Sequence, residues 1–462
     1  MKRITFNKQF MVLMFLLLNC FASYAADENL ITKQITLNLT EAGTLPNKIA
    51  SSRKNLITNL KIIGEINGTD LRFIREMAGS DVKGDSTSGK LSVLDLSEAR
   101  IVKGGDYYGF YCTTSNDIIG NSTFEGCSSL TSVKIPSSVT RIYDSAFKGC
   151  SSLTSVNIPS SVTEIGWYAF KDCSSLTSVN IPSSVTGIAA FKGCTSLTSV
   201  NIPSSVTGIG ESAFEGCTSL TSVKIPSSVT RIYDSAFKGC TSLTSVNIPS
   251  SVTRIYDSAF EGCSSLTSVK IPSSVTKIGW YAFKDCSSLT SVNNLSSVTY
   301  IGYSVFKGCS SLTSVNIPSS VTLIDAATFS GCISLTSVNI PSSVTEIADS
   351  VFYDCKGLKS IYVFAEDVSS ISIGTGAFDG CDSKNCTVYV PKGTYEAYWL
   401  SEFGYFKNIV EFDATSIHNT IATSEVQETA RYAVNGQRLT APIKGINLVK
   451  YSDGTVKKEF VK

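Results

Sequence analysis

The chain is short of the residues on which most catalytic and metal sites depend. It contains a single histidine, His418, which lies outside the repetitive part of the sequence. It has no P-loop, no HExxH motif and no Ser/His/Asp set. Two carboxylates would suffice for acid–base catalysis, but acidic residues such as Glu164, Glu211 and Asp349 fall where the repeats vary. We therefore expect no enzymatic activity, no cofactor and no bound metal.

The chain also has little net charge and few long apolar runs. The 462 residues carry a formal charge of +1, which argues against nucleic acid or an anionic membrane as the main partner. The one long apolar run of the N-terminus covers 10–18 and follows Lys2, Arg3 and Lys8. Because this run is too short for a membrane span, it predicts a secretory signal peptide over 1–25.

Two ways of processing this segment stay open. Ser23-Tyr24-Ala25 is an acceptable small-x-Ala site for signal peptidase. Alternatively Cys20 in "LLNC" is lipidated, although Asn19 departs from the small residue that usually precedes such a cysteine. We favour cleavage near Ala25. In both cases we expect an exported protein, secreted or held on the outer cell surface.

What the sequence has in excess is one repeated segment, which reads "CSSLTSVNIPSSVTEIGWYAF" at 150–170. Each copy contains a cysteine, and nine of the eleven intervals between these cysteines are 23 residues long, with one of 21 and one of 26. The cysteines of this column are Cys127, Cys150, Cys173, Cys194, Cys217, Cys240, Cys263, Cys286, Cys309, Cys332, Cys355 and Cys381. A fixed period of this size predicts a solenoid, in which each coil packs only on its neighbours.

One repeat predicts the path of a coil. Val156 and Ile158 alternate with polar residues, which is the period of a β-strand. Pro159 ends the strand because it has no N–H to donate, and Gly166 allows a sharp bend. We expect eight inward residues in each coil, which in this copy are Leu153, Val156, Ile158, Val162, Ile165, Ala169, Phe170 and Cys173.

Changes in repeat length fall after the strand. The short repeat lacks two residues between Ile188 and Phe191, and the long repeat gains three within 363–378, whereas the strand motif LxxVxI keeps its spacing. The strand side is therefore constrained, and the return side tolerates length changes as loops do. Asn294-Leu295 replaces the Ile-Pro of other repeats, and we expect it to loosen one coil.

The run LxxVxIPxxVTxIGxxAFxxC, over about 91–386, resembles the BspA-like class of leucine-rich repeats found on bacterial cell surfaces and in some protists. The resemblance implies a β-rich leucine-rich-repeat solenoid with 23-residue coils and a parallel sheet on its concave side. It also implies adhesion, or binding to host or matrix proteins, as in some members. Composition and spacing by themselves indicate only the solenoid.

The cysteines of the column are expected to be buried thiols. Neighbouring strands lie about 4.7–4.9 Å apart, so equivalent side chains point the same way, which suits disulfides poorly. Such thiols behave as small apolar groups, and grouped zinc ligands are lacking. The better disulfide candidates are Cys112 and Cys386, the latter with Cys381.

The two ends depart from the repeat. Residues 26–90 predict an N-terminal cap that grades into the array, with a short helix over 71–77 after Asp70 as its N-cap. Residues 387–413 are rich in aromatic side chains and are expected to cap the last coil. The polar stretch 414–430 predicts a linker.

A small β tail is expected over 431–462. Asn435-Gly436 and Gly454 are turn signals with short strands on either side. The turn, the "KGIN" segment and the basic apolar end resemble the sorting tail of type IX secretion substrates in Gram-negative anaerobes. The alternative is a small β end-piece without a role in sorting.

The array offers one regular outward column as a candidate binding surface. Between the inward Val and Ile of each strand stands an Asn or a Lys, which faces away from the core by the period-two rule. The candidates are Asn157, Asn180, Asn201, Lys224, Asn247, Lys270, Asn293, Asn316 and Asn339, with Lys134 before them and Tyr362 after them. This stripe is either a polar binding surface or a solvated face, and both interpretations stay open.

Two other variable positions are weaker candidates. The column between Thr and Ile, which begins at Arg141, mixes charges and sizes, so drift on a solvated surface is the favoured interpretation. Trp167-Tyr168 and Trp280-Tyr281 could stack on sugars or form hot spots. Aromatic residues in such places more often cover an apolar edge, and we favour that interpretation.

Together these features predict an exported, monomeric surface protein that binds macromolecules through its concave face, either a protein or a glycan polymer. With roughly thirteen coils at about 4.8 Å each, the stripe is on the order of 60 Å long, which suits a polymer better than a small molecule. The alternatives are a structural stalk without a specific ligand and a glycan-binding accessory protein.

Overall fold

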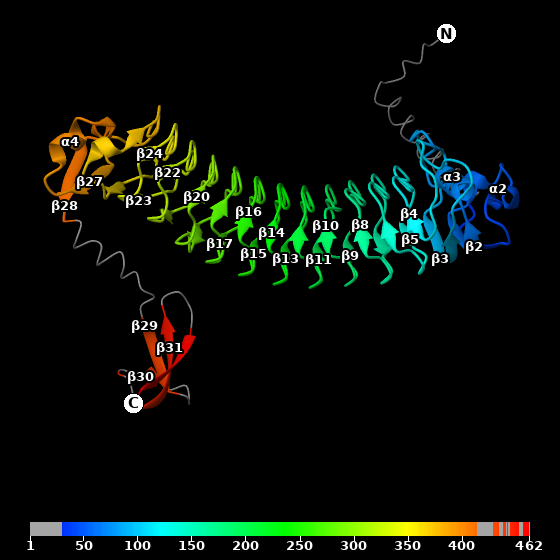
Figure 1. The fold of residues 1–462 in the computed structure, drawn as a ribbon. Helices are drawn as coiled ribbons and strands as arrows, with labels where there is room; N and C mark the ends of the chain where they lie inside the picture. Colours follow the sequence, from blue (N-terminus) through cyan, green and yellow to red (C-terminus); the bar gives the residue numbers. More distant parts are fainter. Residues whose placement is uncertain are drawn as a thin grey trace, which may run out of the picture.

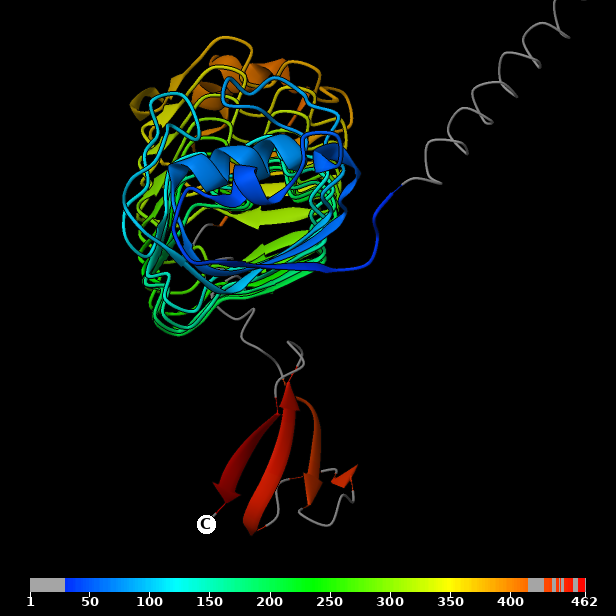
Figure 2. The same ribbon diagram turned by 90° about the vertical axis from the view of Figure 1, so that its right-hand side faces the viewer.

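A solenoid makes up most of the molecule. Figure 1 shows its coils side by side along one axis, and Figure 2 shows them superposed as a ring. The computed structural model describes residues 30–413, 428–433, 438–439, 441, 444–451 and 456–461. Several predicted features lie outside the described residues: the signal peptide 1–25 with Cys20, most of the linker 414–430 with His418, and the turn signals Asn435-Gly436 and Gly454.

A parallel sheet runs along one side of the solenoid in two segments, of five strands (β1 to β7) and eleven strands (β9 to β28). Its strands are β1 (Ile35–Leu39), β2 (Asn59–Ile66), β3 (Val93–Ile101), β5 (Ser132–Lys134), β7 (Ser155–Asn157), β9 (Ser178–Asn180), β11 (Ser199–Asn201), β13 (Ser222–Lys224), β15 (Ser245–Asn247), β17 (Ser268–Lys270), β19 (Ser291–Asn293), β21 (Ser314–Asn316), β23 (Ser337–Ile340), β25 (Ser360–Val363), β27 (Thr387–Pro391) and β28 (Asn408–Phe412). The predicted repeat solenoid is confirmed. It has about sixteen coils rather than thirteen, because strands from both ends extend the sheet.

A second parallel ladder, which the repeat pattern did not predict, runs along another side. Its two-residue strands are β4 (Ile118–Ile119), β6 (Arg141–Ile142), β8 (Glu164–Ile165), β10 (Gly187–Ile188), β12 (Gly208–Ile209), β14 (Arg231–Ile232), β16 (Arg254–Ile255), β18 (Lys277–Ile278), β20 (Tyr300–Ile301), β22 (Leu323–Ile324), β24 (Glu346–Ile347) and β26 (Ser372–Ile373). They form three segments, β4 to β8, β10 to β20 and β22 to β26. The variable column between Thr and Ile therefore has a regular backbone beneath side chains that differ.

The core is a set of parallel columns, one for each inward position. All eight predicted inward residues of the coil at 150–173 are at most 7% exposed, as expected. The column phenylalanines stack from coil to coil with ring centroids 5.1 to 5.8 Å apart, a spacing that suits offset aromatic pairs. Each coil thus buries its large side chains only against its two neighbours.

The thiols form a column of their own inside this core. Cys150 is fully buried, and its Sγ donates to the backbone oxygen of Phe124 in the preceding coil at 3.1 Å. The same contact repeats along the array up to Cys381, whose Sγ lies 3.2 Å from the oxygen of Phe352. Every cysteine that the structure describes is a free thiol. The buried column is confirmed, whereas the disulfides expected at Cys112 and Cys386 are absent among these residues.

The bend of the coil at 150–173 depends on a glycine that lacks a Cβ, as predicted. Gly166 is not in the left-handed region; instead, a Cβ on it would lie 2.7 Å from the backbone nitrogen of Asp144 in the neighbouring coil. Close approach of two backbones therefore requires the glycine. The left-handed residues are Tyr168, with φ 57°, and the residue before each cysteine, such as Gly149 with φ 71°.

Asn294 alters one coil, as expected. It adopts a left-handed conformation with φ 66°, and its Nδ2 donates to the backbone oxygen of Ile271 at 3.0 Å. The strands β19 and β21 pair at one residue, Ser291 with Ser314, as do β11 and β13 in a coil with the ordinary Ile-Pro. The array continues on both sides of this coil.

The N-terminal helices lie across one end of the solenoid, where Figure 2 shows α3 in front of the ring. They are α2 (Leu45–Lys48), the 3-10 helix η1 (Lys54–Leu56) and α3 (Gly68–Met77). The N-cap of α3 is Asn67, whose side chain accepts from the N–H of Thr69 at 3.0 Å. Asp70 was predicted as the N-cap and is instead the third helical residue, where it completes a capping box with Asn67.

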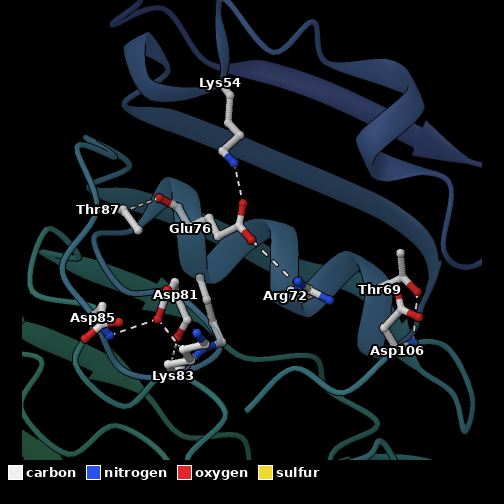
Figure 3. A network of polar contacts seen from close by, with 10 residues as sticks. Lys54, Thr69, Arg72, Glu76, Asp81, Lys83, Asp85, Thr87 and Asp106 are labelled. Carbon is white, nitrogen blue, oxygen red and sulfur yellow. Dashed lines mark hydrogen bonds and ion pairs between the residues drawn. The ribbon is translucent and has the colours of Figure 1, made fainter. Parts of the chain in front are cut away.

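Polar contacts attach α3 to the segments around it (Figure 3). Glu76 forms an ion pair with Lys54, and its backbone oxygen accepts from the hydroxyl of Thr87 at 2.6 Å. Arg75 is 2% exposed, and its guanidinium donates to the backbone oxygens of Thr123 (3.1 Å) and Asp81 (2.9 Å). The helix is therefore tied both to the loop that follows it and to the next coil.

The C-terminal end of the array is covered by aromatic residues. Between β25 and β28 lie η2 (Val368–Ser370), α4 (Tyr395–Trp399) and η3 (Glu402–Tyr405). The rings of Phe403 and Phe406 each lie 5.4 Å from that of Phe378, the last member of the phenylalanine column. These contacts keep the final ring of the column out of water.

The tail forms a separate antiparallel sheet with the strand order β30-β29-β31-β32. Its strands are β29 (Glu428–Ala433), β30 (Arg438–Leu439), β31 (Gly445–Tyr451) and β32 (Val456–Val461). Among the described residues these strands pair only with one another. Over all the residues that the structure describes, from the N-terminal cap to the tail, no helix is long and apolar enough to cross a membrane.

Candidate functional site

The predicted outward column forms one continuous surface, which we call the strand face. It consists of Asn157, Asn180, Asn201, Lys224, Asn247, Lys270, Asn293, Asn316 and Asn339, all of them exposed except Asn339, which is half-buried. Parallel pairing places equivalent residues opposite one another, for example Asn201 beside Asn180 and Lys224 beside Asn247. The structure thus brings the predicted residues together, with one interruption between β7 and β9, which do not pair.

The side chains of the strand face are not occupied by internal contacts. Within the described chain, none of its seven asparagines and two lysines forms a side-chain hydrogen bond or an ion pair with the protein. Amide groups offer both donors and acceptors, and lysines offer donors only. An internal ladder of amide hydrogen bonds, which would favour a purely structural stripe, is therefore not what these side chains make.

Lys134, which precedes the strand face, is different. Its Nζ lies 2.9 Å from Oδ2 of Asp95, a buried carboxylate on β3. Burial opposes the charge on Asp95, but hydrogen bonds from Ser97 and Lys134 hold its pKa below the ordinary value. This lysine is therefore engaged in the fold, whereas Lys224 and Lys270 form no ion pair with any described residue.

An aromatic group continues the strand face at its C-terminal end. Tyr362 follows Asn339 in register and stacks on Tyr389 with ring centroids 4.5 Å apart. The ring of Phe412 meets Tyr362 edge-on at 6.1 Å. The sequence identified Tyr362 from its place in the repeat but missed Tyr389 and Phe412, because they lie beyond the repeats and only the strand register shows their positions.

The two tryptophans of the return arcs have different surroundings. Trp167 and Trp280 are 62% and 51% exposed. The indole nitrogen of Trp280 donates to the hydroxyl of Tyr300 at 2.9 Å. Trp167 instead borders a cavity of about 870 Å³ beside the second ladder, whose walls include Arg141 and Glu164.

Groups suited to catalysis or metal binding do not gather in the part of the chain that the structure describes. No three His, Cys, Asp or Glu side chains there are arranged to hold a metal ion. Some acidic residues of the array form ion pairs instead, such as Glu261 with Lys238 at 2.9 Å and with Lys284 at 3.0 Å. Solenoids of this type are typically non-enzymatic.

Parallel strands, coils of about 23 residues and a buried apolar column at each inward position define a leucine-rich-repeat protein. A family model described as "BspA type Leucine rich repeat region (6 copies)" matches residues 110–190, 187–313, 276–397 and 301–437. These segments cover well over half of the chain, and the chain belongs to this BspA-type family. No curated protein matches it.

Several solved structures are similar to this chain. A leucine-rich repeat protein from Bacteroides ovatus is 29% identical, with 66% of this chain and 90% of that one covered and a TM-score of 0.49. A leucine rich cell surface protein from Faecalibacterium prausnitzii is 34% identical, covering 56% and 86%, with a TM-score of 0.38. A leucine-rich repeat protein from Eubacterium ventriosum is 21% identical, covering 77% and 91%, with a TM-score of 0.44.

Proposed function

We propose that this chain is an exported cell-surface protein that binds a macromolecule, a host or matrix protein, through its strand face. One observation carries the proposal: the side chains of the strand face are in register, and those described form no hydrogen bond with the protein. A surface of free amides and two ammonium groups can bond to the backbone and side chains of a protein partner.

The dimensions of the strand face support a macromolecular partner. From Asn180 to Asn339 it crosses eight strands, a length on the order of 35 Å at about 4.8 Å per strand. This length is comparable to one side of a standard protein–protein interface, which buries about 800 Å² per partner. The rings of Tyr362 and Tyr389 at one end supply the kind of aromatic group that anchors such interfaces.

Two further parts of the proposal concern location. Membership of the BspA-type family supports a place on the cell surface, as does the predicted signal peptide at 1–25. We also propose that the tail, 431–462, is a sorting module for type IX secretion. Its resemblance to such tails and its separate antiparallel sheet support this role.

The test uses charge reversal on one face with a matched control on another. In the first variant Asn201, Lys224, Asn247 and Lys270 are changed to Glu. In the control Arg231, Arg254 and Lys277, exposed residues of the second ladder in the same region, are changed to Glu, which alters the net charge by the same amount. Both variants and the parent are applied to an array of matrix proteins and glycans.

We expect the parent to bind a protein on the array, the strand-face variant to lose that binding by about tenfold or more, and the control to keep it. Equal loss in both variants would mean that binding depends on overall charge, which contradicts the proposal. An array on which the parent binds nothing would favour a structural stalk.

A further inference from the structure

The short repeat opens a groove in the second ladder. The coil at 186–191 lacks two residues found in the other coils, and the ladder stops at β8 and resumes at β10. The resulting cavity, of about 870 Å³, is what we call the groove; it is bordered by Arg141, Glu164, Trp167, Gly187, Gly208 and Tyr233. Its volume lies within the range of small-molecule pockets, about 300–1,000 Å³.

Two adjacent glycines deepen the groove. Gly187 and Gly208 lie opposite each other on β10 and β12, at the position where β14 and β16 have Arg231 and Arg254. A Cβ on Gly187 would meet no atom within 4 Å. A Cβ on Gly208 would lie 3.2 Å from the ring of Tyr233, so the floor of the groove is open backbone at Gly187 and is bordered by that ring at Gly208.

Trp167 stands beside this floor with its indole exposed. Its backbone N–H donates to Oδ1 of Asp144 at 2.7 Å, which fixes the start of the bend that holds the side chain. Trp280 occupies the same position in its own coil, but the following coil has the full length, and its Tyr300 accepts the indole hydrogen bond. Only the coil next to Trp167 is short, so the indoles of the two tryptophans have different surroundings.

Arg141 and Glu164, which line the groove together with Trp167, supply hydrogen-bond donors and acceptors. Nε of Arg141 lies 3.5 Å from Oε2 of Glu164, and the guanidinium also donates to the hydroxyl of Tyr143 at 3.2 Å. Both members of the ion pair are about half exposed and can turn toward a ligand. Since Arg141 is paired with Glu164 and the lining also includes the carboxylate of Asp144, the groove favours a neutral ligand over a strongly acidic one.

We propose that the groove binds a short neutral oligosaccharide, with one pyranose ring on the indole of Trp167 and its hydroxyls bonded to Arg141 and Glu164. A pyranose combines an apolar C–H face, which packs on an aromatic ring, with hydroxyls that both donate and accept. An extended peptide fits less well, because strand addition needs a long sheet edge and the edges here, β8 and β10, are two residues long. The groove lies outside the strand face and this proposal goes beyond the one above.

The test compares two pairs of variants of the mature chain on an array of neutral glycans, followed by calorimetry with a glycan that binds the parent. Trp167→Ala removes the aromatic ring, and Trp280→Ala is its control at the same position in another coil. Gly187→Arg fills the groove and leaves Trp167 in place. Its control is Glu346→Arg, the same column position on β24, away from the groove.

We expect Trp167→Ala and Gly187→Arg each to weaken glycan binding about tenfold or more, and both controls to change it less than about twofold. Melting curves should stay unchanged, because Trp167 is exposed and a side chain on Gly187 enters open space. The strand-face variant described above should keep glycan binding, so the failure of one proposal can be told from the failure of the other. The groove is refuted as a glycan site if no neutral glycan binds the parent, if Trp280→Ala loses as much as Trp167→Ala, or if only peptides compete for it.

Discussion

The residue before each column cysteine is a glycine or an aspartate, and the choice is coupled between coils. Both residue types take the left-handed conformation there, as in Gly239 (φ 69°) and Asp172 (φ 58°). A Cβ on Gly193, in the coil after Asp172, would overlap Oδ1 of that aspartate. The same relation holds for Asp285 with Gly308. An aspartate in one coil therefore requires a glycine in the next, a rule that one repeat cannot reveal.

The cysteine column should be unreactive in the native protein. Burial raises the pKa of Cys127, Cys173 and Cys217 to about 12, so almost no thiolate forms at pH 8. We expect a thiol reagent to modify at most Cys112, which is only partly buried, in the native chain expressed from residue 26. All fourteen described thiols should react after denaturation.

The same shifts predict how stability depends on pH. The unfolded chain loses its thiol protons near pH 9, whereas the native column keeps them up to about pH 12. The native state therefore binds more protons in this range, and the free energy of unfolding should fall as the pH rises from about 9.

A control and a possible contradiction apply to the reaction with the thiol reagent. A Cys112→Ser variant should abolish the native reaction with the reagent, and rapid modification of many native thiols would contradict the buried column.

Elements differ in how far they could be predicted. The strands of the main sheet follow from alternation, as Val156 and Ile158 show, because the strand period places them on one face. The second ladder could not be predicted, since strands of two residues, such as Arg141–Ile142, are too short for any alternation. Helix α3 was placed correctly, but its start was missed, because Asn67 and Asp70 are both good capping residues and only the contacts decide between them.

Helix α3 offers a matched test of how the N-terminal end is held. Arg75 is buried and donates to three backbone oxygens and a serine hydroxyl, whereas Arg72 is about half exposed and lies 3.8 Å from Glu76. We expect Arg75→Met to reduce the free energy of unfolding by about 2–4 kcal/mol, because the buried oxygens lose their donor. Arg72→Met should cost under about 0.5 kcal/mol.

Urea unfolding combined with amide hydrogen exchange would measure both effects. The coils at one end of a solenoid can open without the others, so exchange in α3 and β2 should quicken in Arg75→Met more than exchange in β17. Equal behaviour of the two variants would show that the contacts of Arg75 do not hold the helix in place.

At the scale of the whole molecule, prediction succeeded where each coil repeats the same environment. The nine residues of the strand face were identified because their column obeys one rule along the array. The groove was not identified, although Trp167 and the short repeat were both noticed, because it depends on which residue the next coil places beside Trp167. Tyr389 and Phe412 were missed for the same reason, because the sequence of a single coil does not show which residues of the next coil lie beside it.

The ends of the solenoid allow a sharp test of the tail. The last phenylalanine of the column, Phe378, is already covered by Phe403 and Phe406, and the described strands of the tail pair only among themselves. A chain without 431–462 should therefore keep the melting curve of the parent. If the tail is a sorting module, the same deletion should leave the protein in the periplasm.

A longer deletion supplies the contrast. Removing 387–462 uncovers Phe378 and the buried strand residues around it, so we expect a loss of several kcal/mol, at about 25 cal/mol per Å² of apolar surface exposed, together with aggregation. Melting of the purified chains and fractionation of the expressing cells would separate the two roles. A chain without 431–462 that is destabilised yet reaches the cell surface would show that the tail is a structural cap, because sorting would then proceed without it while the last coil would depend on it.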